Sequence, residues 1–141
     1  MIRLVTDASV LAKWRLQEPH TEAARQLLFC PHTLHAPALM AIEVHNVIVK
    51  KRRRNQVIHV EACRLRNETR SLSIVYVPDM QVLAFAFDIS LNEDLTMCDA
   101  LYTSASAHLD ATLVTEDARL YRAVACAPYA PRVVWVEDTL V

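Results

Sequence analysis

The chain has 141 residues, 53% of them hydrophobic and 22% charged, which is enough to bury the core of one domain without disulfides or a structural metal. It contains no glycine, which excludes the glycine-rich loops that cradle the phosphates of nucleotides, because those loops need backbone without a Cβ atom. The net charge of −1 conceals a division along the chain: residues 50–70 carry eight Lys or Arg, whereas residues 71–118 carry eight Asp or Glu and no Lys or Arg.

Short β-branched segments alternate with segments of helical period along the whole chain. This alternation predicts an α/β fold in which helices cover both faces of a parallel sheet, formed by one domain over residues 1–141. With glycine absent, we expect the turns to use Pro, Asn and Asp. In chain order the predicted elements are strand 2–6, helices 9–16 and 20–29, an extended piece at 34–36, helices 38–54 and 57–70, strand 73–77, helices 79–90 and 96–109, strand 111–115, helix 117–125 and strand 132–136.

The cysteines indicate a reducing cytoplasm, because they are widely spaced and form no CxxC pair. We also expect no secretory leader and no membrane span. Cys30, His32 and His35 could suggest zinc, but a fourth ligand is missing and Pro31 interrupts them, so a surface loop is the favoured interpretation.

An acid follows the first predicted strand: Asp7 comes just before a helix whose start contains Ser9. The carboxyl ends of strands in open α/β sheets are where ligands bind. The sequence leaves two interpretations open, because such an aspartate can also accept hydrogen bonds from the first amides of the next helix.

Glu43 is the second unusual acid, because Leu39, Ile42, Glu43 and Asn46 recur at helical spacing and should share one face. A carboxylate in an apolar stripe is costly unless something positive meets it. The alternatives are that this face is partly exposed or that Glu43 pairs with a distant arginine. We expect His45 to lie on the opposite, exposed side.

Two further acids complete a set of four. Asp99 lies in the first turn of a predicted helix, and Asp117 follows a predicted strand, with Glu116 beside it. Each could serve only as a helix cap or a partner of the helix dipole. Four converging carboxylates would repel one another, a cost that a bound cation offsets, and all-oxygen ligands suit Mg²⁺ or Mn²⁺.

Three segments of the sequence, from Val5 to about Leu120, carry a family resemblance: VTDASVLAKW, LMAIEVHNVI and LTMCDALYTSASAHLDATLVTEDARL. In that order they resemble the acidic motifs of PIN-domain ribonucleases, and more narrowly those of the VapC-type toxins of bacterial toxin–antitoxin pairs. The resemblance implies a five-stranded parallel sheet in the order 3-2-1-4-5. The lack of glycine departs from the family's turns but touches no acidic position.

By position, Asp7, Glu43, Asp99 and Asp117 match the family's acidic quartet. Thr115 matches a supporting hydroxyl residue and Asn46 a polar residue one turn after the glutamate. We expect Ser9 to cap the following helix while supporting Asp7.

The resemblance implies Mg²⁺- or Mn²⁺-dependent hydrolysis of phosphodiester bonds in structured RNA, such as tRNA or ribosomal RNA, with water as nucleophile. Asp7 and Asp99 are the expected principal metal ligands. Asp117 would bind a second metal or its water, and Glu43 would be a ligand or an orienting base. The expected products carry a 5′-phosphate and a 3′-hydroxyl.

The implied partners are RNA, a cognate antitoxin and a second copy of the chain. The basic run Lys50, Lys51, Arg52, Arg53 and Arg54, with Arg64, Arg66 and Arg70, could hold the RNA backbone, but a solvated helix end or an antitoxin contact is equally open. Two rival functions remain at this stage: a non-catalytic PIN-like module that acts with an antitoxin on operator DNA, and a DNA-directed nuclease, which the short chain disfavours.

Overall fold

A five-stranded parallel sheet in the order β3-β2-β1-β4-β5 forms the centre of the computed structural model, which describes residues 2–12, 21–28, 32–127 and 132–140. This architecture confirms the predicted fold class and strand order. The strands are β1 (Arg3–Thr6), β2 (Thr33–Pro37), β3 (Ile74–Val77), β4 (Thr112–Thr115) and β5 (Val133–Trp135).

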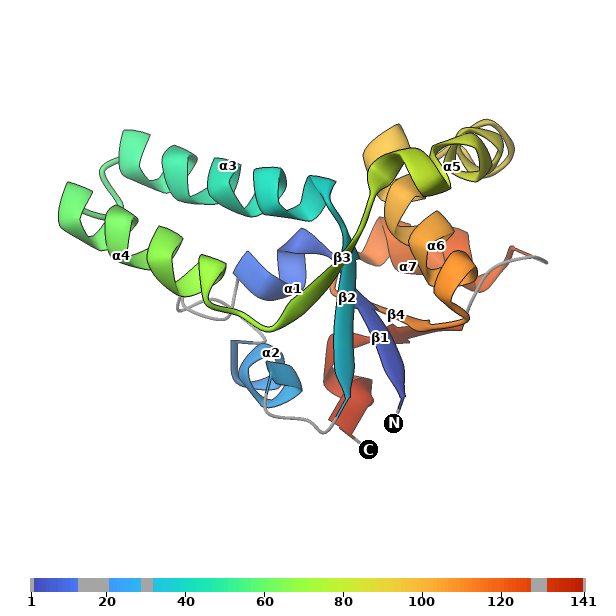
Figure 1. Ribbon diagram of the computed structural model, residues 1–141, viewed down its shortest axis with the longest axis horizontal. Helices are drawn as coiled ribbons and strands as arrows, with labels where there is room; N and C mark the ends of the chain where they lie inside the picture. Colours follow the sequence, from blue (N-terminus) through green and yellow to red (C-terminus); the bar gives the residue numbers. More distant parts are fainter. Residues whose placement is uncertain (1, 13–20, 29–31, 128–131, 141) are drawn as a thin grey trace.

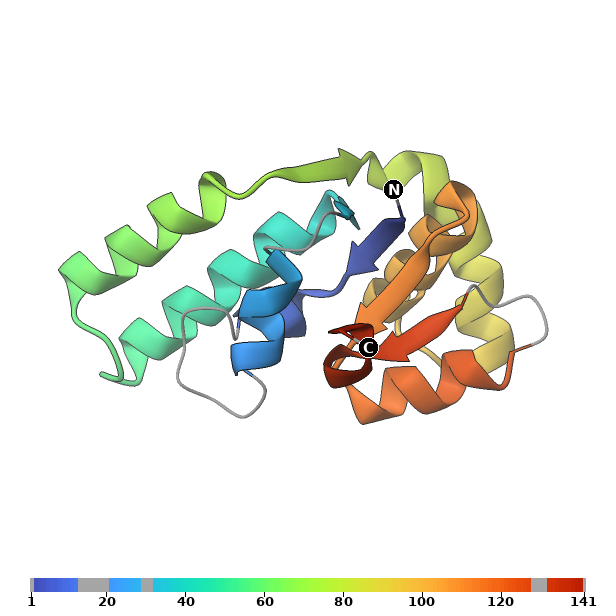
Figure 2. The same ribbon diagram turned by 90° about the horizontal axis from the view of Figure 1, so that it is seen from below.

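Helices surround the sheet and divide into two groups at opposite sides of the molecule (Figure 1). On one side α3 and α4 form a long hairpin, and on the other α5 packs against α6 while α7 lies against β4 and β5, as the perpendicular view in Figure 2 also shows. The helices are α1 (Ala8–Ala12), α2 (Thr21–Leu28), α3 (Leu39–Arg53), α4 (His59–Arg70), α5 (Asp79–Glu93), α6 (Met97–Leu109), α7 (Ala118–Ala125) and the 3₁₀ helix η1 (Val136–Leu140). Among the described residues, none of these helices is long and apolar enough to cross a membrane.

Alternation along the strands gives the sheet two buried faces. Val5 and Leu113, which are paired across β1 and β4, belong to a large core that includes residues of α5, α6 and α7. Leu4 and Val114 point the other way, into a smaller core with Leu27 of α2 and Val136 of η1. Burial on both faces explains why these strands read as continuous apolar runs.

Asn and Asp residues replace glycine at the turns, as the composition predicts. Asn55, Asp94 and Asp110 adopt the left-handed region with φ of 56°, 52° and 50°, each just beyond a helix. These two residue types tolerate positive φ better than other residues with a Cβ atom, which is how this chain ends α3, α5 and α6 without glycine.

Several boundaries differ from the sequence-based expectation. Helix α5 continues to Glu93 rather than residue 90, α4 begins at His59 rather than residue 57, and η1 was not predicted. The ends of the helices predicted over 9–16 and 20–29 fall partly outside the described residues.

Replacing Leu113 tests how strongly the large core stabilises the sheet. Leu113 is fully buried, so Leu113→Ala should lower the free energy of unfolding by about 2 to 5 kcal/mol. Val60→Ala is the control, because the Val60 side chain is exposed and its loss should cost less than about 0.5 kcal/mol. Urea unfolding measures both; equal losses would contradict this assignment of the core.

Candidate active site

Asp7 lies at the carboxyl end of β1, where its backbone N–H donates to the Val114 carbonyl of β4 at 3.4 Å. Its side chain is buried and accepts three hydrogen bonds: from the hydroxyls of Ser9 and Thr115, and from the Val10 N–H at 3.1 Å. Ser9 thus supports the carboxylate as expected, but its predicted capping role is wrong. Asp7 itself receives the helical N–H, because Ser9 is already inside α1.

Burial raises the pKa of Asp7 from 3.8 to about 6, against the opposing effect of its three hydrogen-bond donors. The negative charge of Glu116 adds a smaller increase. The free energy of the ionised form is therefore high in this site, and a nearby positive charge would lower it.

Thr115, the last residue of β4, joins Asp7 to Asp117. Its hydroxyl donates to Asp7 and accepts the Asp117 N–H at 3.0 Å. Asp117 is the N-cap of α7, since its carboxylate accepts the N–H groups of Arg119 at 2.9 Å and Leu120 at 3.2 Å. The capping interpretation of Asp117 is therefore correct, and it coexists with a position next to Asp7.

Glu43 is held by a tyrosine that the sequence analysis did not identify. The buried Tyr102 of α6 donates its hydroxyl to Oε2 of Glu43 at 2.9 Å, so neither a distant arginine nor an apolar stripe explains this acid. Burial, then the charge of Glu43 and its hydrogen bond, raises the pKa of Tyr102, so the hydroxyl keeps its proton.

The predicted shared face of Leu39, Ile42, Glu43 and Asn46 is not the buried face of α3. Ile42 is 64% exposed and Asn46 is exposed, whereas Met40 and Val44 enter the core. The helix is rotated so that Glu43 lies at the edge of its buried face, toward α6.

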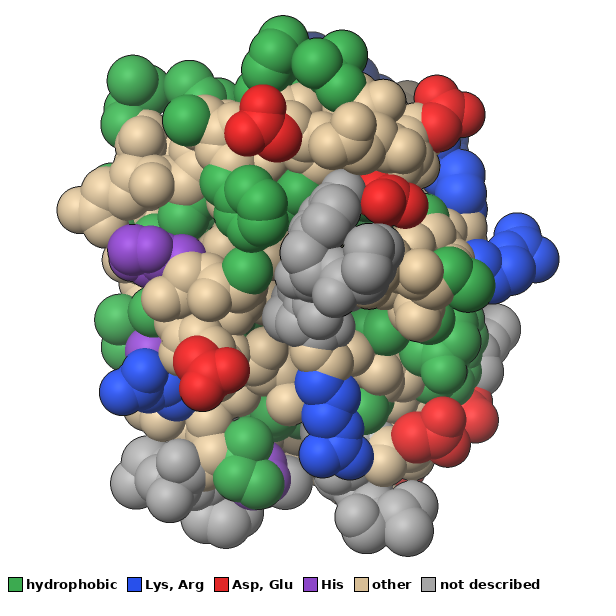
Figure 3. All heavy atoms as spheres, turned by 90° about the vertical axis from the view of Figure 1, so that its right-hand side faces the viewer, with side chains coloured by type: hydrophobic (Ala, Val, Ile, Leu, Met, Phe, Trp, Pro, Cys, Tyr) green, Lys and Arg blue, Asp and Glu red, His purple; other side chains and the backbone are tan. Residues whose placement is uncertain are grey.

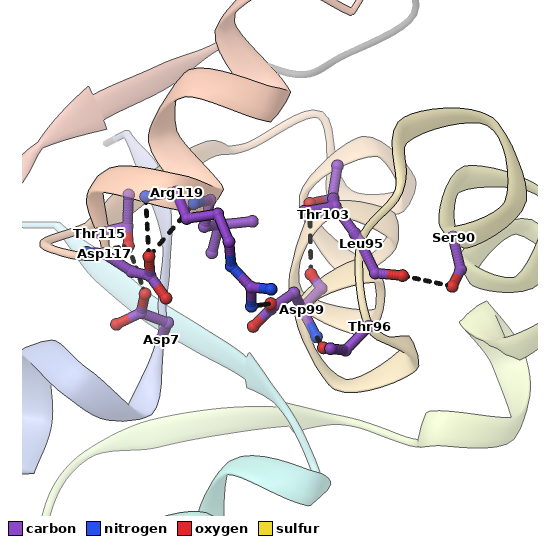
Figure 4. Close-up of polar contacts among 10 residues, drawn as sticks. Asp7, Ser90, Leu95, Thr96, Asp99, Thr103, Thr115, Asp117 and Arg119 are labelled. Carbon is purple, nitrogen blue, oxygen red and sulfur yellow. Dashed lines mark hydrogen bonds and ion pairs between the residues drawn. The ribbon is translucent and has the colours of Figure 1, made fainter.

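Asp99 lies in the first turn of α6, where its N–H donates to the N-cap hydroxyl of Thr96 at 3.2 Å. Its carboxylate forms an ion pair of 2.6 Å with Arg119 of α7, another residue that the sequence analysis missed. Burial raises the pKa of Asp99, the hydrogen bond from Thr96 and the charge of Arg119 lower it, and the charge of Asp117 raises it. Figure 4 shows Arg119 reaching from α7 to Asp99.

The remaining predicted residues lie outside this cluster. Residues 50–53 form the last turn of α3 and Arg54 is its C-cap. His45 is partly buried rather than exposed, and its Nδ1 lies 2.5 Å from the Ala41 carbonyl oxygen. Cys30 lies outside the described residues, and His35 belongs to strand β2 rather than to a surface loop.

The donors are carboxylate and hydroxyl oxygens, whose chemistry fits a hard divalent cation such as Mg²⁺ or Mn²⁺. In the described part of the chain, no group of three or more His, Cys, Asp or Glu side chains is assembled to hold an ion. The reason is visible in the contacts: Tyr102 holds Glu43, Arg119 holds Asp99, and the first amides of α7 hold Asp117. Each of these acids therefore has a protein partner in the structure.

The sequence pattern of the PIN domain matches residues 4–125 of this chain. The chain is 29% identical over 121 residues to the curated protein Ribonuclease VapC3 of Pyrobaculum aerophilum. The match covers 84% of this chain and 92% of that protein.

Two solved structures share the fold at lower identity. One is VapBC2 from Rickettsia felis bound to a DNA fragment from its promoter, with a TM-score of 0.67, 13% identity, and coverage of 95% of this chain and 98% of that chain. The other is VapC20 of Mycobacterium tuberculosis, described as a toxin that cleaves the sarcin-ricin loop, with a TM-score of 0.67, 14% identity, and coverage of 85% and 94%.

The pKa of Asp7 predicts a pH-dependent stability in the presence of a chelator. The folded protein keeps the Asp7 proton up to about pH 6, whereas the unfolded chain releases it near pH 3.8, so stability should fall by up to about 3 kcal/mol as pH rises through this window. Asp7→Asn has no carboxyl proton to lose and should flatten this decline. Denaturant unfolding at several pH values measures it, with the exposed Asp110→Asn as control; a decline of equal size in Asp7→Asn would assign it to other groups.

Proposed function

Because this chain belongs to the PIN domain family, we propose that it is an endoribonuclease that depends on Mg²⁺ or Mn²⁺ and acts as the toxin of a toxin–antitoxin pair. The observation that carries the proposal is the buried Asp7 carboxylate, which Thr115 links to Asp117 at the carboxyl edge of the sheet. Burial disfavours its negative charge, so a bound cation would stabilise it. The name of the curated relative, a ribonuclease, supports RNA as the substrate. The loop-cleaving VapC20 toxin supports a structured RNA as the substrate, such as ribosomal RNA or tRNA. The proposed site of action is the cytoplasm, in line with the widely spaced cysteines.

Asp7 and Asp99 would hold the metal, with Asp117 and Glu43 as further ligands or as groups that orient water. When bound, the metal ion would polarise the scissile phosphate and make water a stronger nucleophile near neutral pH. Ser9 and Thr115 fix both oxygens of Asp7, so this ligand needs little reorganisation on binding.

The four acids divide into a pair held by backbone N–H groups and a pair held by side chains. Asp7 and Asp117 each accept backbone N–H groups at the start of a helix, which fixes their positions. Glu43 and Asp99 are instead held by side chains: the buried Tyr102 holds Glu43, and the largely exposed Arg119 holds Asp99. Asp7 and Asp117 would therefore define the site, and Asp99 and Glu43 would complete the ligand set or orient the attacking water. The expected products carry a 5′-phosphate and a 3′-hydroxyl.

The α3–α4 hairpin would position the RNA backbone. Arg52 and Arg53 of α3 line the same groove of about 300 Å³ as Arg66 of α4, so the two helices contribute cations to one surface. Arg64 differs, because it pairs with Glu61 at 2.5 Å. Clustered guanidinium groups suit a phosphate backbone, and the location on the helix that carries Glu43 connects this surface to the acidic site.

An antitoxin and a second copy of the chain are the proposed protein partners. The VapBC2 complex with promoter DNA supports the antitoxin. The exposed apolar side chains Met80, Leu83, Phe87 and Leu91 share one face of α5 and support self-association. Figure 3 shows hydrophobic side chains gathered at the top of this face of the molecule, over α5.

Asp99→Asn tests the catalytic assignment. The variant should lose Mg²⁺-dependent cleavage of RNA by at least about a hundredfold, since even changes beyond the direct ligands of a metal cost ten- to a hundredfold. The control is Asp88→Asn, an exposed acid of α5. Cleavage of a ribosomal RNA fragment at the wild-type rate by Asp99→Asn would contradict the proposal. Binding of antitoxin and operator DNA without any RNA cleavage by the wild type would favour the non-catalytic module.

A triple variant tests the basic surface. Replacing Arg52, Arg53 and Arg54 by Ser should weaken RNA binding and flatten the plot of log affinity against log salt by about 2, because three phosphate contacts on a single strand would be lost. Titrations at several salt concentrations measure this slope, with the exposed Arg122→Ser as control. An unchanged slope would assign these residues to a solvated helix end or to the antitoxin.

A further inference from the structure

Arg119 is the residue of the candidate site whose contact the acidic quartet does not explain. It is placed in the first turn of α7, where its own N–H donates to the Asp117 carboxylate at 2.9 Å. Its guanidinium reaches across to α6 and pairs with Oδ2 of Asp99 at 2.6 Å. The start of α7 thus supplies both a carboxylate, from Asp117, and a cation, from Arg119, to the site (Figure 4).

The two partners of this ion pair differ in exposure. The Asp99 side chain is 19% exposed, whereas the Arg119 side chain is 59% exposed. The Asp99 carboxylate is therefore largely enclosed in the site, whereas the Arg119 guanidinium borders solvent. A guanidinium carries five N–H donors in a planar fork that matches carboxylate and phosphate oxygens equally well.

The Arg119–Asp99 ion pair reduces the repulsion among the acids of the site. Residues 71–118 contain no Lys or Arg, so Arg119 is the first cation after the whole acidic stretch of the chain. Asp117 and Asp99 are close enough that the charge of one raises the pKa of the other. Arg119 offsets this repulsion through its ion pair with Oδ2 of Asp99.

We infer that Arg119 is a resident counter-ion of the acidic site, which leaves Asp99 when a divalent cation binds and then holds a phosphate oxygen of the RNA substrate. This inference rests on the proposed ribonuclease function. A cation and the guanidinium compete for Oδ2 of Asp99, so the ion pair lowers the apparent affinity for metal. The displaced guanidinium, still anchored through α7 beside Asp117, lies where an incoming phosphate needs a positive partner. Metal binding and substrate binding are thereby coupled through one side chain.

Calorimetric titration with Mn²⁺ in the absence of RNA tests the first step. Arg119→Gln should bind Mn²⁺ about three- to fivefold more tightly than the wild type, the factor expected for losing one competing ion pair near the surface. Without metal, the same variant should unfold about 1 to 4 °C lower, because the acids lose their counter-ion. If Arg119 had only a structural role, Arg119→Gln would lower both the affinity for Mn²⁺ and the unfolding temperature.

Two further variants separate the ion pair from the general effect of charge. Arg122→Gln removes the same charge from the last turn of α7 and should leave Mn²⁺ affinity within about twofold of the wild type. Arg119→Lys keeps the charge and should stay closer to the wild type than Arg119→Gln. An equal gain in Arg119→Gln and Arg122→Gln, or no gain in Arg119→Gln, would overturn the inference.

The kinetics of RNA cleavage test the second step, in which Arg119 holds a phosphate oxygen of the RNA. Arg119→Gln should raise KM for RNA about tenfold, the loss expected for a hydrogen bond to a charged group, and Arg119→Lys should recover part of it. An unchanged KM would overturn the phosphate contact. A wild type that binds Mn²⁺ and shows the Arg119 effect on affinity, but cleaves no RNA, would instead overturn the proposed function while supporting the displacement of Arg119.

Discussion

Burial of the Asp7 carboxyl group is the constraint on which the candidate site depends. Removing this group from water raises its pKa to about 6, and three hydrogen-bond donors limit the cost. Two of them, Ser9 and the Val10 N–H, come from α1, which must begin directly after β1. The third, Thr115, belongs to β4, so Asp7 can be satisfied only if β4 lies next to β1. The strand order of the sheet and the chemistry of the site are therefore parts of one requirement.

Three of the four acids also lie at the start of helices. Asp7 precedes α1, Asp99 lies in the first turn of α6, and Asp117 caps α7. The exposed N–H groups and positive dipole ends of these helices partly offset the repulsion among the carboxylates. Capping is therefore compatible with the proposed metal binding by the same residues: the helix N-termini hold the carboxylates in place, and their fields favour the ionised form.

The pattern of residues predicted local features, whereas the strand order came from the family resemblance. Strand-end acids such as Asp7 and Asp117 are visible because strand, turn and acid are contiguous. Helical period predicted α3 but not which side of it is buried, because that depends on the sheet and on α6, and so Ile42 and His45 were placed wrongly. The contacts of Tyr102 with Glu43, 59 residues apart, and of Arg119 with Asp99, 20 residues apart, exist only after folding. The one sequence signal for Arg119 is its place as the first cation after residues 71–118.

The division of charge along the chain becomes a division in space because a rigid element connects the two parts. Helix α3 carries Glu43 at the acidic edge and ends in the basic residues 50–53, roughly 11 to 15 Å further along its axis. An acidic site alone would repel RNA, and a basic surface alone would bind RNA without cleaving it. A single helix fixes the distance between them at about two or three nucleotides, so an RNA backbone held at the hairpin would reach the carboxylates in a defined register. Arg119 then supplies a positive charge within the acidic site itself, at the point where the distant arginines of α3 are screened by solvent.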